Sequence, residues 1–295
     1  MKLQFSGHDS FICKHFWLKK GYDFIKKGER GFNDEMAVVD LGVGKNMVTA
    51  ISYWLKAYGI TNSSNNITEI GQFLFDKNKG VDPYLEDIAS IWLLHYSLIK
   101  ANKASIYNLF FNEFRRDRTQ FTRDQFLNFL VKKLESIGQT KVNLSTLGND
   151  ISVFIRNYQK AAYKNKKADI EDELSNLFID LQFMESYQSE NAEGRIVEWY
   201  TVESDIRTDL PAKVVLFTIL DNDRYGNSIS FKELASGLNS PGAIFALNED
   251  GLFSKIEQLQ SIYPEIIYTE SAGIRELQFK SKPDKWKVLN DYYKA

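Results

Sequence analysis

The chain has 295 residues, of which 43% are hydrophobic and 26% charged, and its formal net charge is −2. Its 21 Phe, 15 Tyr and 5 Trp provide ample material for a packed core, which excludes a disordered low-complexity chain. The single cysteine, Cys13, excludes a disulfide framework and any multi-cysteine zinc module.

Length and hydropathy set the broad class of the protein. The length favours two domains, because single cores stop growing at about 250–300 residues. No apolar run approaches the roughly 18 residues that span a bilayer, and the N-terminus lacks the apolar region of a signal peptide. We therefore expect a cytoplasmic protein without a membrane partner.

The first half of the chain predicts mainly helices. Apolar side chains recur with helical spacing over residues 46–58, directly after Gly44. Asp82 and Pro83 predict the N-cap and first residue of a buried helix that runs to about Lys100. Thr122 and Gln125 form a capping box, which predicts the start of a helix running to residue 137. Helices are also expected over residues 105–116 and 151–158.

The middle of the chain is acidic. Residues 169–184 have a helical period and predict an acidic helix. Residues 195–202 alternate and are rich in β-formers, which predicts a strand. The polar connection over residues 185–194 is expected to be a flexible loop.

The last third of the chain predicts an ordered series of short elements. These are a helix at 211–222, a β segment at 228–230, helices at 231–236 and 248–263, and a hairpin at 266–280. Helix, strand, helix, helix and hairpin is the order of a winged helix. The expected recognition helix carries Glu249, Asp250 and Glu257 against Lys255, so it suits a protein as readily as DNA.

These elements predict a mainly α protein with small β-hairpins. The expected domains are residues 1–208 and residues 209–295. The first is helical, has possible helix-turn-helix elements and includes an acidic loop region at 168–208. The second is a winged-helix-like domain, and a generic α+β domain is its alternative.

The near-neutral net charge conceals two opposite blocks. Residues 100–167 contain 14 Lys or Arg and 5 Asp or Glu, whereas residues 168–210 contain 2 and 12. The basic block is suited to a phosphate backbone. In the alternative interpretation the two blocks fold against each other or form solvated faces. The candidate contacts to nucleic acid in and before this block are Lys14, Lys45, Asn46, Arg115, Arg116, Lys164, Lys166 and Lys167.

The stretch around Lys45 has half of the P-loop pattern. Gly44 and Lys45 match its end, but Val39 stands where the first glycine is required and Asn46 where the magnesium-binding Ser or Thr is required. A Gly-Lys turn that opens a helix still favours an anion, because its backbone N–H groups are free. The alternative is a plain loop with a solvated lysine.

The N-terminus gathers residue types that can carry chemistry. A metal site could be drawn from His8, Asp9, Cys13 and His15, but their spacing is not that of a known zinc module. A Cys-His nucleophilic pair lacks an orienting third group. We therefore predict no catalytic residue, metal or cofactor here, and interpret His95 in its apolar run as a hydrogen-bonded core histidine.

Several motifs resemble an uncharacterised prokaryotic domain-of-unknown-function family. The matching stretches are residues 5–11, 41–48, 82–86, 92–95 and 240–242, so the resemblance covers nearly the whole chain. His8, Asp9, Lys14, Lys45 and Asn46 fall within its pattern, whereas Cys13 and His15 do not. The resemblance implies a protein encoded in defence islands beside phosphoadenosine phosphosulfate reductase-like and DNA phosphorothioation genes.

Three functional hypotheses follow. The first is a non-enzymatic DNA-binding or adaptor protein of a phage-defence or DNA-modification system of the phosphorothioation type. The second is a scaffold whose acidic segment docks a basic partner, such as a sulfurtransferase-like or phosphoadenosine phosphosulfate reductase-like protein. The third and weakest is a hydrolase or nuclease centred on His8 and Asp9.

Overall fold

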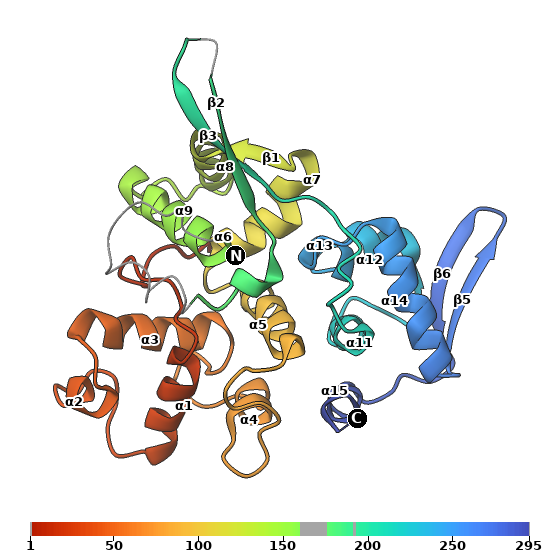
Figure 1. The fold of residues 1–295 in the computed structure, drawn as a ribbon, viewed down its shortest axis with the longest axis horizontal. Helices are drawn as coiled ribbons and strands as arrows, with labels where there is room; N and C mark the ends of the chain where they lie inside the picture. Colours follow the sequence, from red (N-terminus) through yellow and green to blue (C-terminus); the bar gives the residue numbers. More distant parts are fainter. Residues whose placement is uncertain (1, 160–175, 191–192, 295) are drawn as a thin grey trace. The chain divides into compact units, whose positions relative to one another are not determined.

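The computed structural model describes residues 2–159, 176–190 and 193–294 (Figure 1). The chain forms two compact units, Met1–Phe110 with Asp117–Val202 (unit 1) and Phe111–Arg116 with Glu203–Ala295 (unit 2). Helices dominate, which confirms the predicted mainly α protein with small β-hairpins, and the strands form two small three-stranded antiparallel sheets. Within the described ranges no helix has both the length and the apolar character needed to cross a bilayer.

Unit 1 is a set of helices with one sheet. Its helices are α1 (Trp17–Lys27), α2 (Ala37–Leu41), α3 (Lys45–Ala57), α4 (Glu69–Phe75), α5 (Ile88–Ala101), α6 (Ser105–Leu109), α8 (Arg123–Ser136), α9 (Leu144–Tyr158) and the 3₁₀ turn η2 (Ile179–Leu181). Its strands are β1 (Gln120–Thr122), β2 (Glu185–Glu190) and β3 (Ile196–Thr201), in the order β1-β3-β2.

The core of unit 1 is aromatic. Trp92, His95 and Tyr158 are almost fully buried, and the rings of Phe178 and Phe183 pack against them. His95 Nδ1 lies 3.1 Å from the Tyr158 hydroxyl, which confirms its interpretation as a hydrogen-bonded core histidine. His95 is therefore both packed against aromatic rings and hydrogen-bonded within the core.

The start of the buried helix α5 differs from the prediction. Asp87, and not Asp82, is the N-cap, and its side chain accepts a hydrogen bond from Ala89 N. Asp82 instead accepts hydrogen bonds from the backbone N–H groups of Glu86 and Asp87. Leu85, directly before Glu86, has a left-handed φ of 56°. The carboxylate of Asp82 thus closes a turn that precedes the helix.

The acidic helix predicted at 169–184 is wrong where the structure describes it, and residues 169–175 lie outside the described residues. Residues 176–184 contain the short turn η2 and no longer helix. The side chain of Asn176 accepts a hydrogen bond from the backbone N–H of Phe178. Gln182 ends the turn at a left-handed φ of 47°. Local side-chain hydrogen bonds of this kind compete with helix formation.

The loop predicted at 185–194 is also wrong in its first part. Residues Glu185–Glu190 form strand β2, which pairs with all six residues of β3. Tyr187 lies opposite Trp199 in this register, and their rings stack at 9°. Such cross-strand aromatic pairs stabilise a strand that is polar in sequence.

Unit 2 follows the predicted series of short elements. They are α11 (Ala212–Leu220), β4 (Ser228–Ser230), α12 (Phe231–Ser236), α13 (Pro241–Ile244), α14 (Glu249–Ile262), β5 (Ile266–Ser271), β6 (Ile274–Phe279) and α15 (Lys285–Tyr293), with strand order β4-β6-β5. The helix α15 is absent from the predictions. It begins at the N-cap Asp284 and buries Val288 and Leu289.

Unit 2 also contains a segment from the middle of the chain. Helix α6 continues into a π-helical turn, η1 (Phe110–Phe114), and the single turn α7 (Arg115–Asp117). The amides of Asn112 and Asn239 exchange two hydrogen bonds: Nδ2 of Asn112 donates to Oδ1 of Asn239 at 2.9 Å, and Asn239 N donates to Oδ1 of Asn112 at 2.7 Å. Arg116 donates to the carbonyl of Ser236.

Candidate nucleic-acid interface

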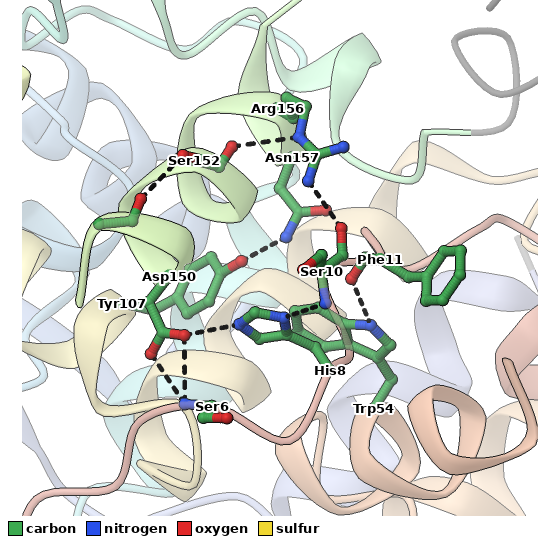
Figure 2. A network of polar contacts seen from close by, with 11 residues as sticks. Ser6, His8, Ser10, Phe11, Trp54, Tyr107, Asp150, Ser152, Arg156 and Asn157 are labelled. Atoms are coloured by element: carbon green, nitrogen blue, oxygen red, sulfur yellow. Dashed lines mark hydrogen bonds and ion pairs between the residues drawn. The ribbon is translucent and has the colours of Figure 1, made fainter. Parts of the chain in front are cut away.

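A buried carboxylate in α9 holds the N-terminal segment in place (Figure 2). Both oxygens of Asp150 accept the backbone N–H of Ser6, at 3.1 and 2.9 Å, and Oδ1 lies 2.8 Å from Nε2 of His8. The side chains of His8 and Asp150 are 4% and 3% exposed. The pair joins residues that are far apart in sequence and fixes the path of the chain before α1.

The hydrogen bonds of His8 define its tautomer. Ser10 N donates to Nδ1 at 3.2 Å, so Nδ1 is an acceptor and the proton lies on Nε2, which donates to Asp150. The ring also stacks on Trp54 at 17° and meets the edge of Tyr53. Both ring nitrogens are therefore engaged, and His8 serves to position the segment. Asp9 is exposed and does not join this network.

Two further hydrogen bonds hold the same segment. Arg156 Nη2 donates to the carbonyl of Ser10 at 2.7 Å, and Trp54 Nε1 donates to the carbonyl of Phe11 at 3.2 Å (Figure 2). Lys14 follows this anchored stretch and is half-buried, with Nζ 5.9 Å from the centre of the Trp17 ring. The network thus fixes the chain from which Lys14 projects.

Cys13 is fully buried, and burial raises the pKa of its thiol. The neutral thiol is a poor nucleophile, so we expect a thiol reagent at neutral pH to leave native Cys13 unlabelled and to label it after unfolding in denaturant. Mass spectrometry of the intact protein measures both states. Rapid labelling of the native protein would contradict the burial of Cys13.

Lys45 and Asn46 are exposed at the start of α3. Gly42, in the left-handed conformation at φ 59°, ends α2, and Gly44 is the N-cap of α3 without a side-chain cap. The first N–H groups of this 13-residue helix are therefore not capped by a side chain, which favours an anion beside Lys45.

A groove of about 300 Å³ lies on α1, next to the end of α2. Its rim carries two exposed aromatic rings, Phe16 and Tyr84, which are 61% and 59% exposed. Its lining residues are Phe16, Lys19, Lys20, Asp23, Phe24, Lys27, Asp40, Leu41 and Tyr84. We call it the lysine groove. Leu41 precedes Lys45 by four positions, so the groove and the α3 N-terminus are neighbours in the chain.

Polar contacts shape the lysine groove. Nζ of Lys20 donates to the carbonyl of Leu41 at 3.0 Å, and Nζ of Lys19 pairs with Asp23 at 2.6 Å. Nε2 of His15 donates to the carbonyl of Tyr84 at 2.8 Å, which ties the Phe16 side of the groove to the Tyr84 side. Lysine side chains can bind phosphates, and the exposed aromatic rings beside them can stack on bases.

The other candidate contacts lie elsewhere. Arg115 is 7% exposed in unit 2, where it donates to Ser204 Oγ at 2.6 Å, and burial, with the charge of Arg207, lowers its pKa to about 10. Arg116 is exposed. Lys164, Lys166 and Lys167 lie outside the described residues. The structure thus brings Lys14 and Lys45 into unit 1 with the groove, and places the two arginines in unit 2.

The groove was missed at the sequence level. Lys19, Lys20 and Lys27 all lie on α1, and the first two stand within four residues of the aromatic Phe16 and Trp17. This interleaving of basic and aromatic residues was the available signal. Tyr84 carried no such signal, because its place in the groove lining depends on the turn that Asp82 closes.

The described residues hold no group of three His, Cys, Asp or Glu side chains placed to bind a metal ion.

Comparisons with known proteins find one matching family and two similar crystal structures. A family model described as "Protein of unknown function (DUF4007)" matches residues 5–293. Two crystal structures of SspB share the fold. The first, with a bound magnesium ion, is 27% identical at a TM-score of 0.85, and the second is 26% identical at 0.81. Each match covers 99% of this chain and 88% of SspB. No functionally curated protein matches the chain.

Proposed function

The chain belongs to the DUF4007 family, and on this premise we propose that it is a DNA-binding protein of a DNA-modification system of the phosphorothioation type. The lysine groove carries the proposal. Three lysines, Lys19, Lys20 and Lys27, line it together with the exposed rings of Phe16 and Tyr84. Lys14 and Lys45 are nearby in the chain.

The electrostatics of the lysine groove favour a polyanion. Its two carboxylates already have partners, because Asp23 pairs with Lys19 and Asp40 pairs with Arg30 at 2.8 Å. The side chains of Lys27 and Lys45 are exposed, so phosphate oxygens can reach them. The α3 N-terminus adds uncapped N–H groups close by in sequence.

The similarity to SspB supports the setting. It extends over 99% of this chain at 27% identity, which covers both units. The family resemblance of its sequence motifs implies a place among DNA phosphorothioation and defence genes. A role in binding or handing over DNA in such a system, for phage defence, is consistent with both.

Unit 2 is proposed to be a winged helix. Its helix order and its sheet β4-β6-β5 are consistent with that fold, with β5 and β6 as the wing. Its α14 carries exposed Glu249, Asp250 and Glu257, which are unfavourable beside phosphates. We therefore assign the main DNA contact to unit 1 and leave α14 to a protein partner.

DNA retardation at two salt concentrations tests the proposal. Binding through lysines releases counterions, so we expect the affinity for duplex or single-stranded DNA to fall steeply as salt rises. Comparison of the two DNA forms tests the aromatic rim, because stacking on Phe16 and Tyr84 favours unpaired bases. The absence of any shift at low salt would refute the proposal.

Lys45→Ala tests the α3 N-terminus. Loss of one phosphate contact should weaken DNA binding and reduce the salt slope by about 1, with the melting temperature unchanged. Lys56→Ala, at the other end of α3, is the matched control and should keep the wild-type slope. Equal slopes for the two variants would place the phosphate elsewhere.

A further inference from the structure

We propose that the outer edge of β2 binds a basic β-strand of a partner protein. The sheet order β1-β3-β2 leaves β2 at an edge, and all six of its residues are exposed. In Figure 1 the hairpin of β2 and β3 extends beyond α8. This inference concerns a surface separate from the lysine groove and does not depend on DNA binding.

The backbone groups that face outward can be identified. Val202 N donates to Thr119 O, so in β3 the residues in step with Val202, such as Tyr200, point their backbone groups toward β1. The alternate residues, including Trp199, then point toward β2, because antiparallel pairing alternates. Trp199 lies opposite Tyr187.

It follows that Tyr187 bonds inward to β3, whereas its neighbours in β2 point their N–H and C=O groups outward. The outward residues are Ser186, Gln188 and Glu190. No described residue forms a backbone hydrogen bond with these outward groups. Unpaired groups in a row are a template for a further strand.

The edge of β2 lacks three of the devices that usually prevent strand addition. Such edges carry Lys, Pro or a bulge. The sequence of β2 contains neither residue, and its register with β3 runs without a bulge from Glu185 to Glu190. Its charged residues are Glu185 and Glu190, which repel an acidic strand and attract a basic one.

The two faces of the hairpin specify the chemistry of the incoming strand. Tyr187, Val197 and Trp199 form an apolar cluster on one face, which also carries Glu185 at one end of β2. Glu190 and Glu198 lie on the opposite face and are exposed. A partner strand that carries apolar residues opposite Tyr187 and Lys or Arg near Glu185 and Glu190 therefore complements this edge.

The charge of the hairpin favours a basic polypeptide at this edge over a second copy of the chain or DNA. Residues 185–201 contain four Glu and one Arg, a net charge of −3. Two hairpins of this charge repel each other, which disfavours a second copy of the chain, and DNA phosphates are repelled in the same way. A basic polypeptide is attracted.

A matched pair of variants tests the edge. The probe is a peptide as long as β2 that alternates lysine and valine. Gln188→Pro removes an outward N–H and leaves the inward bonds to β3, since proline is tolerated at an edge whose N–H faces solvent. We expect it to weaken peptide binding about tenfold, whereas Gln188→Ala, which keeps the N–H, binds as the wild type.

Hydrogen exchange supplies the independent readout. Bound peptide should slow exchange at the amides of Gln188 and Glu190, and a peptide with glutamate in place of lysine should not. Equal affinity of the two variants, or of the two peptides, would overturn the proposal. Self-association that Gln188→Pro abolishes would replace the basic partner with a second copy. DNA binding should be the same in both variants.

Discussion

Asp150→Ala is expected to lower the free energy of unfolding of unit 1 by about 3 kcal/mol, because it leaves two donors without an acceptor. Those donors are the Nε2–H of His8 and the backbone N–H of Ser6, both of which donate hydrogen bonds to the Asp150 carboxylate. The site is buried, so water does not replace the lost acceptor at low cost. Urea unfolding followed by tryptophan fluorescence measures the change, since Trp54 stacks on His8.

A double-mutant cycle separates this pair from general packing. His8→Ala leaves the Asp150 carboxylate buried with one partner fewer, at a cost of about 3–5 kcal/mol. The variant with both substitutions should be clearly more stable than the sum of the two single losses predicts. It has neither the unpaired Asp150 carboxylate nor the unpaired Nε2–H of His8. Simple additivity would show that His8 and Asp150 do not act as a unit.

Gly242→Ala should disrupt unit 2 by about 3 kcal/mol or more, because an added Cβ has no space. That atom would lie 2.1 Å from the carbonyl oxygen of Ala235, at the end of α12. The obstacle is backbone and not the end of a flexible side chain, so α12 and α13 must move apart. Hydrogen exchange should accelerate over both helices, and the melting temperature should fall.

Gly148→Ala is the matched control. Gly148 lies inside helix α9, and an added Cβ there meets nothing within 4 Å. Alanine should therefore stabilise the protein by about 0.8–1 kcal/mol through helix propensity alone. The same substitution at two glycines thus has opposite expected signs. A Gly242→Ala protein as stable as the wild type would show that α12 and α13 are not packed as described.

Elements specified by neighbouring residues were predictable from the sequence. The capping box of Thr122 and Gln125 forms as expected, with both reciprocal hydrogen bonds present. The bounds of β4 and α12 also match, because Ser230 caps α12 through Glu233 N directly after the strand. In both places the hydrogen bonds join residues three apart, so the local pattern contains the whole cause.

Features that depend on distant partners were not predictable. Asp150 meets His8 across 142 positions of sequence, and β2 becomes a strand because it pairs with β3. A partial signal for Asp150 existed. It shares the face of α9 that Leu147, Ile151 and Phe154 bury, and a carboxylate on an apolar face requires a buried partner. The sequence does not identify that partner.

The composition of unit 2 has a consequence for its synthesis. Phe111–Arg116 leaves the ribosome before any of Glu203–Ala295 has been translated, yet it belongs to the same unit. The two hydrogen bonds between Asn112 and Asn239 can therefore form only after Asn239 has been translated. Unit 2 completes its folding only after its C-terminal segment has been translated, and a gene fragment that starts at Glu203 encodes it without its first segment.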